Sequence, residues 1–268
     1  EKPTDGEVLY NYNGEYKDVT KFTKNEMFEF RKKVQMVFQD PYSALNPQKK
    51  IYTSFEEPLK THGVSSVEER EKIMNRVLKM VNIQPDYLMR FPHEFSGGQR
   101  QRLCIARALE VTPEVLICDE PVSALDVSIQ AQVLNLMKEI QKEMNLTYLF
   151  IAHDLSVVQY MSDRIMVMYL GKIVEVADSK ALYDEPLHPY TKALISAIPV
   201  ADIHYKKKRQ VLEGEVPSPI HKPSGCAFHN RCPYCMDICK KEDPALRYHG
   251  ADGHMTACHL YDGSEVNA

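Results

Sequence analysis

The sequence predicts an α/β fold with a parallel central sheet, and three observations lead to that class. The runs KVQMVFQD, EVLICDEP and LTYLFIAHD are short and apolar, as buried strands are, and each ends in polar residues. The segments between them have helical periodicity, and alternation of strand and helix is typical of a parallel sheet. EFSGGQRQRL is typical of a glycine turn that opens a helix, a common place for a bound anion.

The first elements of the predicted core are a hairpin, a strand and a helical region. EVLYNYNGEYKDV has alternating apolar residues around Asn13-Gly14, a strong signal for a hairpin turn. KVQMVFQD is expected to be a strand that ends at Gln39-Asp40. From Pro41 to about Arg90 the pattern is helical. Here Ser66 and Glu69 can form a capping box, and one apolar face holds Ile73, Val77 and Met80.

The next elements of the core are two strands, the helix between them and a second hairpin. EVLICDEP is an apolar strand that ends in Asp119 and Glu120, and LTYLFIAHD is expected to be a buried strand ending at His153. SIQAQVLNLMKEIQKEM lies between them and has one apolar helical stripe. RIMVMYLGKIVEVA is expected to be a hairpin that turns at Gly171-Lys172. We expect the core to occupy residues 1–179.

The composition changes after about Ser179, which predicts a separate extension at residues 180–268. Prolines become more frequent there, and five of the seven cysteines fall between Cys226 and Cys258. Without a signal-peptide pattern, these cysteines indicate a reducing compartment, where metal sites are commoner than disulfides. The net charge of −4 gives no sign of a nucleic-acid footprint. No apolar run approaches the ~20 residues of a membrane span.

Ser96, Gly97 and Gly98 are the clearest candidates for a phosphate-binding turn. Ser96 can cap the helix, the glycines let a ligand approach the backbone, and the first helical amides would point at it. The P-loop motif G-x-x-x-x-G-K-[ST] does not occur in these residues, because only Gly171 precedes a lysine and Ile173 follows that lysine. We therefore expect an N-terminal truncation, before or within the P-loop region.

Asp119 and Glu120 are the candidates for the chemistry of the site. Ligands of open parallel sheets bind beyond the carboxyl ends of the strands, where this pair is expected. One carboxylate there can hold Mg²⁺ through water, and the next can polarise an attacking water. An acidic turn before Pro121 is the alternative. Gln39 and His153 end two other strands at the same predicted edge, and the order of all these signals makes them informative together.

Five motifs in order give the chain a resemblance to ABC-type ATPases that covers residues 1 to about 177. FSGGQ resembles the signature motif, VLICDEP the Walker B strand, SALD the D-loop, IAHD the switch-histidine region and VFQD the Q-loop. FQDPYSALNP, HEFSGGQRQR and LYDEPLHPYTKAL are more narrowly similar to the ATP-binding subunits of bacterial oligopeptide/dipeptide importers. The tail, with SGCAFHNRCP, is most similar to that of the F-type subunit. The resemblance implies a RecA-like P-loop ATPase core, without its P-loop segment, and a helical subdomain at about 41–100.

The resemblance also implies roles for single residues. Glu120 would be the catalytic base, and His153 would be the switch residue near the γ-phosphate of ATP. The residues implied to bind the nucleotide and its Mg²⁺ are Gln39, Asp119, the D-loop residue Asp126 and the signature residues Ser96, Gly97, Gly98 and Gln99. In this family two subunits sandwich two nucleotides, so this signature would hold the γ-phosphate of the partner's ATP.

The same resemblance implies partners and a location. We expect a second ATPase subunit in a heterodimer, two transmembrane permease subunits and, indirectly, an extracytoplasmic peptide-binding protein, but no nucleic acid. The protein would lie on the cytoplasmic face of the cell membrane as a peripheral subunit. Because the P-loop motif is absent, the chain alone is expected to be inactive.

The cysteine cluster is too dense for incidental thiols. Cys232 and Cys235 have the C-x-x-C spacing of a zinc site. The related importers instead imply four ligands that bind a 4Fe–4S cluster, and thiolate ligation suits either group. These four are Cys226, Cys232, Cys239 and Cys258, which leaves Cys235 surplus.

Two other classes of function compete with the importer subunit. A chromosome-maintenance (SMC) or repair ATPase shares the signature and Walker B motifs, but such proteins insert a long coiled coil between Q-loop and signature. Gln39 and Ser96 lie only 57 positions apart, with no sustained heptads. A non-catalytic module would use the metal-bearing tail alone, and the presence of Glu120 argues against it.

Overall fold

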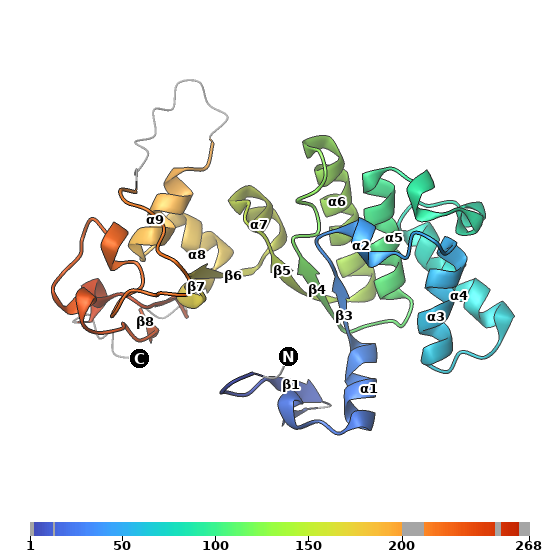
Figure 1. The fold of residues 1–268 in the computed structure, drawn as a ribbon, viewed down its shortest axis with the longest axis horizontal. Helices are drawn as coiled ribbons and strands as arrows, with labels where there is room; N and C mark the ends of the chain where they lie inside the picture. The colour runs from blue at the N-terminus through green and yellow to red at the C-terminus, as the bar shows by residue number, and fades with distance from the viewer. Residues whose placement is uncertain (1–2, 13, 200–211, 250–252, 263–268) are drawn as a thin grey trace. The chain divides into compact units, whose positions relative to one another are not determined.

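The computed structural model describes residues 3–12, 14–199, 212–249 and 253–262 (Figure 1). The chain forms two compact units, residues 1–152 and 153–268. Within the described ranges, no helix is long and apolar enough to cross a membrane.

The centre of the first unit is a three-stranded parallel sheet, as the sequence predicts. Its strands are β3 (Val34–Val37), β4 (Val115–Asp119) and β5 (Thr147–Ile151), in the order β3-β4-β5. The register pairs Val37 with Cys118 and Asp119 with Ile151. Because all the strands run in the same direction, the residues that follow them meet at one edge of the sheet.

A hairpin and a helix precede this sheet. β1 (Leu9–Tyr12) and β2 (Glu15–Asp18) pair antiparallel, which confirms the predicted hairpin. Helix α1 (Lys24–Lys33) was not expected from the sequence, although Thr23 and Glu26 form a capping box at its start. Its hydrophobic periodicity is poor because no residue of α1 is buried, so the cap was the only local signal.

The helical region after β3 is confirmed. It contains α2 (Pro41–Ala44), α3 (Ile51–Thr61) and α4 (Val67–Met80), and α5 (Gly97–Leu109) follows it (Figure 1). Ser66 caps α4 by accepting a hydrogen bond from the backbone of Glu69. The buried face of α4 differs slightly from the expected one: Met74, Val77 and Leu78 are buried, whereas Ile73 and Met80 are only partly covered.

Strand β5 is less buried than its apolar sequence predicts. Tyr148 packs toward helix α6 (Val127–Met144), where its hydroxyl donates to the carbonyl of Met137 at 2.8 Å. Leu149 and Ile151 project from the opposite face and are 44% and 45% exposed. The expectation of a fully buried strand was therefore wrong, because successive side chains of a strand face opposite sides and only one side is covered by the described residues.

The second unit contains a four-stranded antiparallel sheet in the order β6-β7-β9-β8. Strands β6 (Arg164–Tyr169) and β7 (Lys172–Asp178) form the predicted hairpin. Leu170 and Gly171 at its turn both have positive φ, 47° and 78°. The short strands β8 (Arg247–Tyr248) and β9 (Met255–Thr256) come from the predicted extension and continue this sheet.

Helices and one buried acid complete the second unit. The helices are α7 (Leu155–Met161), α8 (Ser179–Asp184) and α9 (Pro189–Ser196). Glu175 of β7 is fully buried and accepts hydrogen bonds from the backbone of Leu187 and His188 and from His254. The hairpin and the extension thus share one polar centre, although the sequence placed them on opposite sides of a boundary near residue 179.

Candidate functional site

The glycine turn is the N-terminus of helix α5, as expected. Ser96 is the N-cap residue: its hydroxyl accepts from the backbone of Gln99 at 3.3 Å, and Gln99 Oε1 accepts from the backbone of Ser96 at 3.0 Å. This capping box holds the turn in one conformation. The first amides of a helix have no partner within it, so those of Gly97 and Gly98 are oriented for an anion.

The two glycines lie against the residues around Asp126. A Cβ atom on Gly98 would lie 2.5 Å from Cγ2 of Ile129, and one on Gly97 would lie 3.6 Å from Cδ2 of Leu125. Asp126 itself caps α6, where it accepts from the hydroxyl of Ser128 and the backbone of Ile129. The hydrogen bond from Ser128 is the main reason that the pKa of Asp126 is lowered. The signature and D-loop segments therefore form one packed surface.

The acid pair lies at the carboxyl end of β4 and meets the residue predicted from β3. Asp119 is the last residue of the strand, and Glu120 follows in the left-handed region with φ of 43°. The Glu120 N–H donates to the carbonyl of Ile151 at 3.0 Å, which fixes this turn to β5. Gln39 Nε2 donates to Glu120 Oε2 at 2.9 Å. The structure thus brings together Gln39 and Glu120, which lie 81 positions apart.

His153 follows β5 and is the first residue of the second unit. The next residue, Asp154, caps α7 by accepting from the backbone of Ser156 at 2.8 Å. A role for His153 beside the acid pair stays a prediction.

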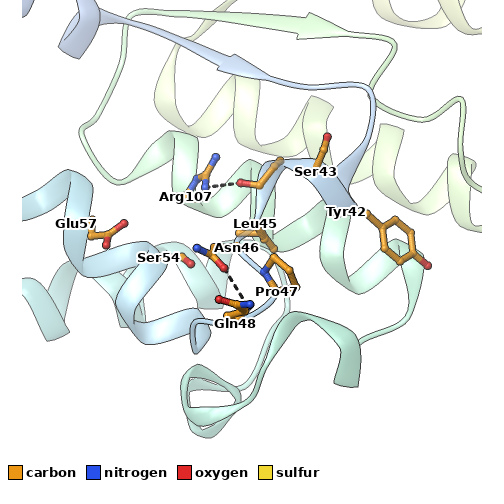
Figure 2. Close-up of a pocket in the computed structure, with 10 residues that line it drawn as sticks. Tyr42, Ser43, Leu45, Asn46, Pro47, Gln48, Ser54, Glu57 and Arg107 are labelled. Carbon is orange, nitrogen blue, oxygen red and sulfur yellow. Dashed lines mark hydrogen bonds between the residues drawn. The ribbon is translucent and has the colours of Figure 1, made fainter.

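A groove that the sequence did not indicate lies next to α2. It has a volume of about 640 Å³ and is lined by Ser54 and Glu57 of α3, by Arg107 of α5 and by residues 42–48 (Figure 2). The Arg107 guanidinium donates to the carbonyl of Ala44 at 2.7 Å. A local signal for this groove was the run SALNPQ after the predicted Q-loop, in which polar residues are frequent. Which helices line the groove depends on packing.

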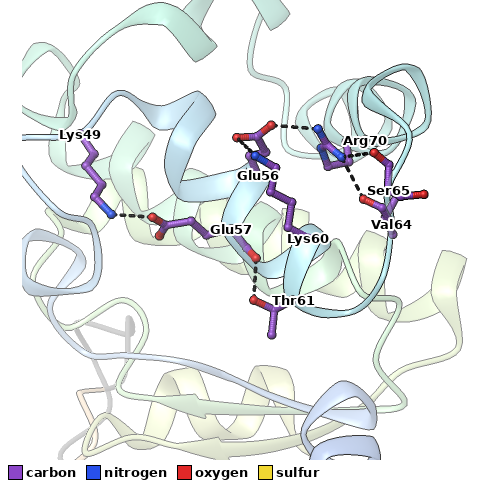
Figure 3. Close-up of polar contacts among 8 residues, drawn as sticks. All are labelled: Lys49, Glu56, Glu57, Lys60, Thr61, Val64, Ser65 and Arg70. Atoms are coloured by element: carbon purple, nitrogen blue, oxygen red, sulfur yellow. Dashed lines mark hydrogen bonds and ion pairs between the residues drawn. The ribbon is translucent and has the colours of Figure 1, made fainter.

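A buried arginine fixes the helix that forms one wall of this groove. Arg70 of α4 is 4% exposed and donates to Glu56 Oε1 of α3 at 3.0 Å and to the carbonyls of Val64 and Ser65 (Figure 3). Lys60 also pairs with Glu56 at 2.9 Å, and this contact is the main reason that the pKa of Glu56 is lowered. Because α3 is held in this way, the groove is a formed surface.

The cysteines of the tail are close together in the folded chain. The Cys226 N–H donates to the carbonyl of Cys239 at 2.8 Å. Burial raises the pKa of Cys226, and the nearby thiols of Cys239 and Cys232 raise it further. Burial likewise raises the pKa of Cys258 to about 11, with contributions from the same three thiols but none from Cys235.

Backbone amides point at several of these thiols. The N–H groups of Phe228, Tyr234 and Leu260 bond to the sulfur two residues earlier, in Cys226, Cys232 and Cys258. Such bonds favour the thiolate, which is the form that binds metal. Across the described parts of the chain, no group of three or more His, Cys, Asp or Glu side chains is arranged for a metal ion.

Comparison with known proteins decides the family. Residues 1–123 match the ABC transporter family, and residues 174–239 match the oligopeptide/dipeptide transporter C-terminal region. The chain is 51% identical over 263 residues to the oligopeptide transport ATP-binding protein AppF of Bacillus subtilis, covering 97% of the chain and 78% of AppF. This chain belongs to the ATP-binding proteins of oligopeptide and dipeptide ABC transporters.

Other members and two solved structures agree with this family. The di/tripeptide transport ATP-binding protein DppF of Pseudomonas aeruginosa is 45% identical and spans 97% of the chain and 78% of DppF. The ABC transporter component cbiO1 of Clostridium perfringens has 27% identity and a TM-score of 0.59, covering 69% of this chain and 70% of its own. A dimeric ATP-binding cassette bound to ADP and phosphate has 30% identity and a TM-score of 0.57, with coverage of 67% and 75%.

Membership in this transporter family argues against both alternative functions, the chromosome-maintenance or repair ATPase and the non-catalytic module. It makes the protein an ATPase subunit of a transporter and not a non-catalytic module. The match of the tail to an oligopeptide transporter region likewise favours transport over chromosome maintenance or repair.

Proposed function

We propose that this protein is the F-type, energy-coupling subunit of an oligopeptide or dipeptide importer, with Glu120 as the base that activates water for ATP hydrolysis. The hydrogen bond between Gln39 and Glu120 carries this proposal. It joins the acid at the end of β4 to the segment that leads into the groove. One contact therefore links the reacting residue to a surface where another subunit can dock.

The residues at this edge fit a nucleotide and Mg²⁺. Asp119 provides a carboxylate at the strand end, and Gln39 provides an amide oxygen, both suitable for a hard cation and its water. When bound, Mg²⁺ would neutralise charge on the phosphates of ATP. Glu120 would accept a proton from the attacking water, and the bond from Gln39 keeps its carboxylate at the sheet edge until substrate arrives.

The glycine turn would complete the site of a second subunit. The first amides of α5 and its helix dipole can hold the γ-phosphate of ATP bound to the partner. Because Ser96 and Gln99 already cap each other, they position the turn as well as lining it. Asp126 would lie at the seam between subunits, and His153 would contact the γ-phosphate.

The groove beside α2 is the surface proposed to receive a permease subunit. Its lining is polar and apolar in equal parts, and the carboxylate of Glu57 in it is paired to Lys49 at 2.5 Å (Figure 3). A formed groove of mixed polar and apolar lining suits a contact between subunits. Docking of two permeases would place the ATPase dimer at the cytoplasmic face of the membrane, while peptides reach the permeases through an extracytoplasmic binding protein.

The test is Glu120→Gln in the protein with its P-loop restored, assembled with its second ATPase subunit and permeases. The amide keeps the shape but accepts no proton, so ATP turnover at this site should fall by about 10²-fold or more. Glu114→Gln is the matched control, because Glu114 lies at the other end of β4 and bonds to Tyr10 and Lys33. Unchanged turnover in the Glu120 variant would make Glu120 a structural neighbour of Asp119.

For the tail we propose that Cys226, Cys232, Cys239 and Cys258 bind an iron–sulfur cluster of the 4Fe–4S type. Their mutual effects on thiol pKa indicate that they lie close together, and the amides aimed at three of them would stabilise bound thiolates. The preference for a cluster over zinc rests on the resemblance of the tail to the related importers, and thiolate ligation suits either group.

Anaerobic purification followed by iron, sulfide and zinc analysis tests this proposal. We expect iron and sulfide with brown absorption, and loss of both in Cys239→Ser. Cys235→Ser is the matched control and should retain the cluster, because Cys235 acts on the pKa of Cys232 but not on that of Cys226 or Cys258. One zinc per chain, or a cluster that depends on Cys235, would refute the ligand set.

A further inference from the structure

One face of helix α5 is built to hold the short helix α2. Arg100, Cys104 and Arg107 are spaced four and three residues apart, so they lie on the same side of α5. Each of them contacts a different residue of α2. The two helices are therefore joined along the whole length of α2, and α2 directly follows the Q-loop residue Gln39.

Arg100 makes the first of these contacts through its guanidinium. The central carbon of this group lies over the ring of Tyr42, 3.5 Å from the ring centroid, and the group also donates to the Tyr42 hydroxyl. A second bond runs to the carbonyl of Pro92 at 3.4 Å. Arg100 is only 7% exposed, whereas Tyr42 is 60% exposed. A buried charge with so few partners is costly, which indicates that its position matters.

Cys104 and Arg107 fasten the rest of α2. Arg107 donates to the carbonyl of Ala44 at 2.7 Å and forms part of the groove (Figure 2). The Cys104 thiol lies 3.9 Å from the carbonyl of Pro41, and burial raises its pKa to about 11, so it is a neutral packing group. The arginines thus supply the directional contacts at the two ends of α2.

The contacts of Arg100, Cys104 and Arg107 with α2, here called the clamp, connect the groove with Glu120 and with the glycine turn. At one end of α2, Gln39 bonds to Glu120, and at the other end the chain forms the groove. The N-terminus of α5, with Ser96 and its glycines, lies one turn before Arg100. A displacement of the groove must therefore move the glycine turn as well, as long as the clamp holds.

We propose that Arg100 and Arg107 are positioning residues that couple the groove to the anion-holding turn of α5, with the stack of Arg100 on Tyr42 as the critical contact. This inference deepens the proposed function and rests on it for what occupies the groove and the turn. The coupling between the two segments is itself a property of this chain, and it can be measured without nucleotide or partner.

Hydrogen exchange of the full chain measures that coupling. A charged hydrogen bond and a cation–π contact together correspond to about ten- to a hundredfold in a local opening equilibrium. In Arg100→Met we expect exchange in residues 41–46 to rise by about tenfold or more. In Tyr42→Leu, where only an exposed side chain changes, exchange should rise by a similar factor in residues 100–104 of α5. Tyr42→Phe keeps the ring stack and should show a smaller effect.

A second arginine–tyrosine stack in the same unit provides the matched control. Arg90 lies over Tyr87 at 3.8 Å, between α4 and α5, and neither residue lines the groove. Tyr87→Leu should leave exchange in 41–46 and in 100–104 unchanged. The proposal is overturned if Tyr42→Leu affects only its own segment, or if both tyrosine variants affect the same segments equally.

The assembled transporter separates this inference from the proposed function. In Arg100→Met of the protein with its P-loop restored, a residue that does not line the groove, the stimulation of ATPase activity by docked permeases should fall about tenfold, while the KM for ATP stays the same. A loss confined to the KM, or unaltered stimulation, would refute the coupling role. If the unmodified protein shows no stimulation by permeases, the proposed function fails. The hydrogen-exchange results for Arg100→Met and Tyr42→Leu then still test whether α2 and α5 are coupled.

Discussion

Replacement of Gly98 by alanine tests the packed surface between the glycine turn and α6. The new methyl group would lie 2.5 Å from Cγ2 of Ile129. Ile129 is branched at Cβ, so this methyl group turns only with the whole side chain and gives way poorly. At Gly97 the corresponding distance to Leu125 is 3.6 Å, an ordinary van der Waals contact. A methyl group is therefore expected to clash at Gly98 and to fit at Gly97.

The magnitude follows from two opposing effects. A glycine-to-alanine change inside a helix is favourable by up to about 1 kcal/mol, and both positions lie in the first turn of α5. Overpacking costs about 1 to 3 kcal/mol, and only Gly98 suffers it. Gly98→Ala should thus be less stable than Gly97→Ala by about 1 to 3 kcal/mol, since the helical preference largely cancels between them.

Urea unfolding followed by far-ultraviolet circular dichroism measures the difference, since the chain has no tryptophan. Ile129→Ala removes the atom that clashes, so in the Gly98→Ala/Ile129→Ala double variant the cost of the alanine should shrink by about 1 kcal/mol or more. Equal stability of the two single variants, or additive effects in the double variant, would show that the turn does not press on α6.

Three further predictions concern buried groups. Burial raises the pKa of Glu110 to about 9, so the folded chain holds a proton that the unfolded chain releases, and stability should fall by up to about 1.4 kcal/mol per pH unit between about pH 4.5 and 9. Glu110→Gln should remove this slope in urea titrations. Burial lowers the pKa of His188 to about 4, so stability should fall as the pH drops from about 6.5 to 4, and His188→Gln should flatten that acid limb. Glu175→Ala leaves His254 and two backbone donors unpaired and should cost about 3 to 5 kcal/mol, seen as a lower midpoint of thermal unfolding, and an unchanged midpoint would contradict this.

The sequence by itself determined the order of elements and the residue types at the sheet edge. The runs before Gln39 and after Glu114 are apolar because strands of a parallel sheet are covered, and the change to polar residues marks where each strand stops. The Ser96 cap was equally predictable, since it depends on residues three positions apart. The sequence was less reliable for β5, where composition does not reveal which face is covered.

Only the tertiary structure decided which of these residues meet. Gln39 and Glu120 lie 81 positions apart and Arg100 and Tyr42 lie 58 apart, and no local pattern specifies either contact. The close approach of Gly98 to Ile129 likewise depends on how α5 packs on α6. Periodicity reports how a side chain faces its own helix or strand, whereas a contact between elements depends on the distance and angle at which they pack, and packing is a property of the whole fold.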